Sequence, residues 1–98
     1  MTWKIKLKEG FFRTVDCEMT LDEGQLFISP LDHGFHPDVE LDMDEIVYIT
    51  LNRKDQSFTE LEIRTTQLIL VAQLPDPSCE EPLIQALNAA FQTRLQVI

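Results

Sequence analysis

The period of the apolar residues changes within LILVAQLPDPSCEEPLIQALNAAFQTRLQVI (residues 68–98), and this change sets the expected architecture. Leu68 to Leu74 has the length and apolar content of a strand. Pro75-Asp76-Pro77 then ends the strand, and Ser78 with Glu81 three residues later forms a capping-box pattern, which is typical of a helix start. Beyond it, apolar residues recur every three or four positions and predict one amphipathic helix packed on a sheet. Its apolar stripe comprises Leu83, Ile84, Leu87, Ala90, Phe91, Leu95 and Ile98.

Upstream of this stretch the dominant period is two, which is typical of strands with one buried and one solvated face. Trp3, Ile5 and Leu7 alternate with lysines, and similar alternation recurs along the chain. Gly10 and Gly24 follow the first two runs and can adopt the positive φ of tight turns, so the first three strands should form a meander of hairpins. Six strands are expected before residue 68: Trp3–Lys8, Val15–Asp22, Leu26–Ile28, Asp38–Met43, Ile46–Leu51 and Phe58–Arg64.

Length and charge limit the class of protein. The 98 residues are enough for one domain, covering residues 1–98, and too few for a multidomain enzyme. The net charge of −9, from 8 Lys and Arg against 17 Asp and Glu, repels nucleic acid and anionic bilayers, so neither is an expected partner. No apolar targeting segment is found at the N-terminus, and a cytoplasmic protein is expected. Cys17 and Cys79 form no Cys-x-x-Cys pair and are expected to be reduced thiols in or near the core.

Seven short strands followed by one C-terminal helix resemble the pleckstrin-homology (PH)-like superfold, which includes GRAM-type and bacterial PH-like domains. Lys8-Glu9-Gly10-Phe11-Phe12 is similar to the first-strand opening of many PH domains. Val39-Glu40-Leu41, Asp44-Glu45-Ile46 and Leu61-Glu62-Ile63 are similar to the middle of GRAM-type domains. The resemblance implies an α+β fold, mainly antiparallel β, in which a seven-stranded barrel is closed by the helix. It also implies that the core receives Leu83, Leu87, Phe91 and Leu95.

The chain departs from lipid-binding PH domains at two places. Phosphoinositide-binding members commonly have a Lys followed by a Lys/Arg-x-Arg cluster near the first hairpin, whereas Arg13 is followed here by Thr14 and Val15. Many members have a Trp in the closing helix, where this chain has Phe91. The lipid-headgroup function is therefore not carried over, and a GRAM-type lipid-binding module remains an alternative only.

Charge is distributed unevenly along the chain. Residues 14–52 include ten acidic side chains and no Lys or Arg, which predicts an acidic surface on one side of the domain. Such a surface favours encounter with a basic partner and rejects acidic ones. Acidic solvent faces also keep sheet edges soluble, and the sequence leaves both roles open. The acidic residues predicted to bind a partner from the fourth strand and the turn after it are Asp38, Glu40, Asp42 and Asp44.

The segment from Pro30 to Pro37 has the composition of a loop and forms the longest excursion expected in the domain. Phe35 in this loop and Phe58 at a strand start are the apolar residues least obviously needed for the core. Exposed aromatic residues beside charge are typical of binding hot spots, although each ring can also fold back over a barrel end. Asp32 is the acidic residue of this loop that is predicted to bind a partner together with Phe35.

Imidazole and carboxylate groups in the same loop suggest a different class of site. His33 and His36 lie between Asp32 and Asp38, and these residue types suit zinc or nickel. Small-ligand or divalent-metal binding through the 32–38 loop is therefore an alternative, although the pair lacks a third fixed ligand. No nucleophile and base pattern and no Gly-rich phosphate loop is present, so neither enzymatic activity nor a cofactor is expected.

The sequence thus predicts a non-enzymatic protein-interaction or assembly module with an acidic docking surface. An edge strand or groove would pair with a partner segment while acidic side chains set the charge preference. The partner is expected to be another protein or a second copy of this chain. The predicted partner-binding residues are Asp32, Phe35, Asp38, Glu40, Asp42, Asp44 and Phe58.

Overall fold

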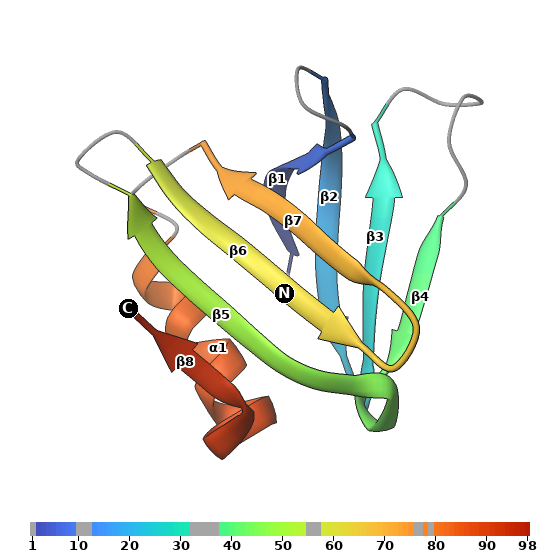
Figure 1. Ribbon diagram of the computed structural model, residues 1–98, viewed down its shortest axis with the longest axis vertical. Coiled ribbons are helices and arrows are strands. Elements are labelled where there is room, and N and C mark those ends of the chain that lie inside the picture. Colours follow the sequence, from blue (N-terminus) through green and yellow to red (C-terminus); the bar gives the residue numbers. More distant parts are fainter. Residues whose placement is uncertain (1, 10–12, 32–37, 55–57, 76–77, 79) are drawn as a thin grey trace.

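A computed structural model describes residues 2–9, 13–31, 38–54, 58–75, 78 and 80–98 of the chain (Figure 1). These residues form eight strands in one sheet and one α-helix near the C-terminus. The strands are β1 (Thr2–Lys8), β2 (Thr14–Asp22), β3 (Gln25–Pro30), β4 (Val39–Asp42), β5 (Ile46–Lys54), β6 (Phe58–Thr65), β7 (Ile69–Leu74) and β8 (Leu95–Val97). The helix is α1 (Glu80–Phe91), and the short 3₁₀ turns include η1 (Met43–Glu45) and η3 (Gln92–Arg94).

The sheet is one open ladder in the order β4-β3-β2-β1-β7-β6-β5-β8. Every pairing is antiparallel except that of β5 with β8. β1 joins the two halves, because it pairs with β2 along its length but with β7 only at Lys6 and Leu7. Consequently the layer of β5, β6 and β7 crosses in front of β1 and β2 (Figure 1). In the described part of the chain β4 and β8 are the two edges, so the predicted closed barrel is wrong, as is the count of seven strands.

Alternation of apolar and polar residues forms these strands as expected. Apolar side chains at every second position turn toward the space between the two halves of the sheet, while the polar ones face solvent. Cys17 is part of this core, as predicted, and Cys79 lies outside the described residues. The buried apolar residues are Trp3, Ile5, Val15, Cys17, Met19, Leu26, Ile28, Leu41, Ile46, Ile49, Leu51, Leu61, Ile63, Ala72, Leu74, Leu83, Leu87 and Phe91.

Helix α1 lies on the β5 side of the molecule (Figure 1). It buries Leu83, Leu87 and Phe91, which confirms the apolar stripe in its first three turns. Pro82 is accommodated because it falls in the first helical turn, where backbone N–H groups have no acceptor within the helix. No helix in the described ranges is both long and apolar enough to cross a membrane.

The helix ends earlier than its apolar period predicts. Gln92 adopts a left-handed conformation, with φ of 51°, and the chain then turns through η3 into β8. β8 runs parallel to β5, with Leu95 beside Ile49. The expectation of one helix reaching Ile98 is therefore wrong, and Ile98 is 68% exposed. Spacings of three and four placed Leu95 on the helical stripe, but pairing with the edge of β5 gives its backbone a sheet partner instead.

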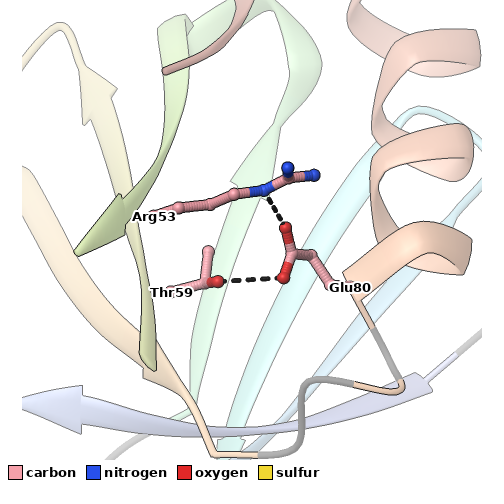
Figure 2. A network of polar contacts seen from close by, with 3 residues as sticks. All are labelled: Arg53, Thr59 and Glu80. Atoms are coloured by element: carbon pink, nitrogen blue, oxygen red, sulfur yellow. Dashed lines mark hydrogen bonds and ion pairs between the residues drawn. The ribbon is translucent and has the colours of Figure 1, made fainter. Parts of the chain in front are cut away.

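Two polar networks fix the C-terminal region to the sheet. At the start of α1, the Glu80 carboxylate accepts a hydrogen bond from Arg53 Nε and another from Thr59 Oγ1, the latter at 3.1 Å (Figure 2). At its end, Arg94 Nη1 donates to the carbonyl oxygens of Met43 at 2.8 Å and Ile46 at 3.0 Å. Both ends of the helical segment are thereby tied to residues flanking or within β5 and β6.

Gly24 in the turn between β2 and β3 has φ of 80°. An added Cβ would meet no atom within 4 Å, so only the backbone conformation opposes a side chain there. We expect Gly24→Ala to lower the free energy of unfolding by about 1–2 kcal/mol, because a left-handed conformation disfavours Cβ by that amount. Urea denaturation measures the change. Gly24→Asn should lower the free energy of unfolding by less than Gly24→Ala does. An alanine variant as stable as the parent would contradict this explanation.

Candidate protein-interaction surface

Four exposed carboxylates lie along and beside the edge strand β4. Asp38 immediately precedes β4, Glu40 and Asp42 lie within it, and Asp44 follows in η1. We call these four residues the acidic edge. Between them Val39 and Leu41 face the core side, since they pair with the buried Ile28 and Leu26. The period of two therefore predicted correctly which β4 side chains reach solvent.

An aromatic side chain lies beside the acidic edge on the same face of the sheet. Phe27 of β3 is directly opposite Glu40, and Thr20 of β2 is opposite Phe27 on its other side. Phe27 is half-buried, although Leu26 and Ile28 on either side of it are fully buried. Phe27 is not among the predicted partner-binding residues, although its position between two inward-facing residues indicates that it lies on the outer face.

One member of the acidic edge makes a polar contact across the strands. Gln25 Nε2 donates a hydrogen bond of 2.9 Å to Asp42 Oδ1. Neither of the ion pairs described in the structure, Lys8 with Glu60 and Arg53 with Glu80, includes a residue of the acidic edge. The charge of these four carboxylates is thus directed to solvent.

On the other side of the strands β1 to β4, away from β4, positive and negative side chains balance one another. Lys4 of β1 lies opposite Glu18 of β2, and Lys6 lies opposite Asp16. Opposite charges at directly paired positions attract one another. The outer face of β1 to β4 therefore changes from mixed charge at β1 to uncompensated negative charge at β4.

The backbone of β4 is also open on one side. Within the described residues β4 pairs only with β3. An edge strand presents unpaired N–H and C=O groups that can pair with another chain. The acidic edge therefore combines hydrogen-bonding backbone with negative charge.

An apolar pocket of about 260 Å³ lies at the end of the core nearest the start of β4. Val15, Cys17 and Ile28 are its buried residues, while Leu7, Val39 and Leu70 are half-buried. Pro30, Lys8 and Glu9 complete the lining. Because Val39 lines the pocket and lies between Asp38 and Glu40 in the chain, the pocket and the acidic edge are adjacent.

The remaining predicted site residues are not brought to this surface by what the structure describes. Asp32, Phe35 and the histidine pair lie outside the described residues, and Phe58 begins β6 with a side chain that is likewise outside them. Among the described residues no group of three or more His, Cys, Asp or Glu side chains could hold a metal ion. Metal or small-ligand binding by the 32–38 loop and GRAM-type lipid binding remain untested predictions.

Comparison with known proteins bears on the fold. No family model matches the chain, and no curated protein matches its sequence. A chain in the structure of the Spt16D Pob3N heterodimer is similar, with a TM-score of 0.69 and 17% sequence identity. The match covers 99% of this chain and 52% of the other, so this chain spans about half the length of the one it matches. At this identity the likeness concerns the fold alone, and together with the antiparallel sheet and C-terminal helix it supports a PH-like fold.

Proposed function

We propose that this chain is a non-enzymatic protein-interaction or assembly module that binds a basic protein segment at the acidic edge. The observation that carries the proposal is the coincidence of four exposed carboxylates with an edge strand open to pairing. Backbone pairing gives affinity without sequence preference, whereas charge selects the partner and speeds encounter.

Three further observations support this proposal. Phe27 offers an aromatic contact within the same face, and aromatic residues are enriched among interface hot spots. The similar solved structure is that of a heterodimer, so a chain that includes a similar fold is part of a protein complex. A net charge of −9 extends the attraction for a basic partner over the whole domain.

We expect the double variant Glu40→Gln and Asp42→Asn to bind a lysine-rich peptide about tenfold more weakly than the parent. The loss corresponds to about 0.7 kcal/mol for each exposed charge pair removed. Fluorescence anisotropy with a labelled peptide at low ionic strength measures it. The Asn side chain keeps an oxygen that can accept the Gln25 hydrogen bond, so the variant should remain folded.

A matched control removes the same charge from the balanced end of the face. Asp16→Asn with Glu18→Gln deletes two carboxylates that lie opposite Lys6 and Lys4. We expect this control to bind nearly as well as the parent, and salt near 0.5 M to abolish the difference between the two variants. Equal losses from both variants would show that net charge alone, and not the acidic edge, governs binding.

A further inference from the structure

The register of β3 and β4 defines which backbone groups of β4 are free. The Met43 N–H donates to the Gly24 carbonyl at 3.0 Å, in line with the β3–β4 register. Hydrogen-bonded and non-hydrogen-bonded pairs alternate along an antiparallel ladder. Val39 and Leu41 therefore bond to β3, and the N–H and C=O groups of Glu40 and Asp42 point to the open side.

A strand added at this edge would have its side chains sorted by the same alternation. On the outer face its residues would lie next to the Glu40 and Asp42 carboxylates, which favours Lys or Arg. On the inner face its residues would lie next to Val39 and Leu41, which favours apolar side chains. The edge thus selects an extended segment in which basic and apolar residues alternate.

The apolar pocket lies where one of those inner-face side chains would arrive. Val39 is part of its wall, and Leu7 of β1 and Leu70 of β7 also line it and are only partly buried. An apolar cavity of ~150 Å³ is enough to hold a benzene molecule. A pocket of about 260 Å³ therefore has room for an aliphatic or aromatic side chain.

We propose that the pocket beside Val39 holds one apolar anchor residue of a basic, extended partner segment that pairs with β4. This inference rests on the proposed function, and it adds the partner's pattern: apolar residues at alternate positions, with Lys or Arg between them. The open edge, the charge of the outer face and the pocket on the inner face each select a different feature of that one segment. A second copy of this chain is a poor occupant through β4 itself, because pairing two such strands would bring their carboxylates together.

The test uses a capped peptide of about nine residues, a length typical of strands, in which lysine alternates with valine and leucine occupies the central apolar position. Leu70→Phe partly fills the pocket, whereas Val71→Phe adds the same ring to the opposite face of β7. We expect Leu70→Phe to weaken peptide binding about tenfold or more, as loss of one buried leucine contact does. Val71→Phe should leave the affinity nearly unchanged.

Changing the peptide avoids any effect on the fold of the protein. Replacing the central leucine by alanine should weaken binding to the parent chain about tenfold, but should have little further effect on the Leu70→Phe variant, since both changes remove the same contact. In NMR spectra the Glu40 and Asp42 amides should become protected from hydrogen exchange when the peptide binds.

The outcomes separate the inference from the proposed function. Salt-sensitive binding that depends on Glu40 and Asp42, but is indifferent to the central leucine and to Leu70→Phe, overturns the anchor pocket and leaves the acidic edge standing. Binding that is indifferent to the acidic edge overturns both. A dimer of this chain that protects the Glu40 and Asp42 amides and prevents the peptide from binding identifies a second copy as the occupant and also overturns the inference.

Discussion

Phe91→Ala is expected to lower the free energy of unfolding by about 3–5 kcal/mol, the range for truncating a large aromatic side chain in a packed core. Phe91 is only 2% exposed and is the last residue of α1, where it joins the helix to the core of the sheet. A domain of this size has a total stability of about 5–15 kcal/mol, so the loss is a large share of it. Urea denaturation followed by circular dichroism measures the change.

Asn88→Ala is the matched control, because this side chain is exposed on the same helix. Its effect should stay within about 0.5 kcal/mol. A Phe91→Ala protein that unfolds at nearly the same urea concentration as this control would show that the helix contributes little to the core, contrary to its complete burial of Leu83 and Leu87.

Arg94→Met is expected to lower the free energy of unfolding by about 2–3 kcal/mol. Its guanidinium donates to two carbonyl oxygens, those of Met43 and Ile46, and lies 5.4 Å from the centre of the Phe91 ring. Hydrogen bonds from a charged donor contribute about 1.5–3 kcal/mol, and methionine retains much of the apolar stem. Denaturation in urea at neutral pH measures the loss, and Arg94→Lys should recover part of it.

The Arg94 contacts should also stabilise the pairing of the last strand, β8, with β5. β8 is fixed to β5 partly by the Ile98 N–H, which donates to the Leu51 carbonyl at 2.8 Å. We therefore expect the Ile98 amide to exchange faster with solvent in Arg94→Met. Arg64→Met removes an exposed arginine from β6 and serves as the control. Equal exchange at Ile98 in both variants would assign the attachment of β8 to its own pairing rather than to Arg94.

The acidic edge lies apart from the residues that stabilise the fold. The residues that hold the helix against the core, Phe91 and Arg94, belong to the β5 side of the sheet, while Glu40 and Asp42 belong to the β4 edge. Substitutions at exposed positions of β4 should therefore change binding with little effect on unfolding. A loss of binding in these variants can therefore be assigned to the acidic edge and not to unfolding of the domain.

Part of the candidate site could be predicted from the local sequence. Glu40 and Asp42 are exposed because every second residue of a half-buried strand faces solvent, and that rule needs only the local sequence. Asp38 and Asp44 flank the strand and are exposed as well. Phe27 was missed although the same rule places it on the face opposite to that of Leu26 and Ile28. The pocket could not be predicted at all, since Leu7, Val39 and Leu70 meet only when three distant strands are packed together.

The sequence by itself determined the order of the first seven strands, the faces they bury and the helix that follows, because periods of two and of three to four are local properties of the chain. Tertiary structure alone decided that the sheet stays open between β4 and β8 and that residues after Phe91 leave the helix to pair with β5. The physical reason is that strand pairing depends on which backbone edge is free in space. No residue carries that information before the strands are assembled.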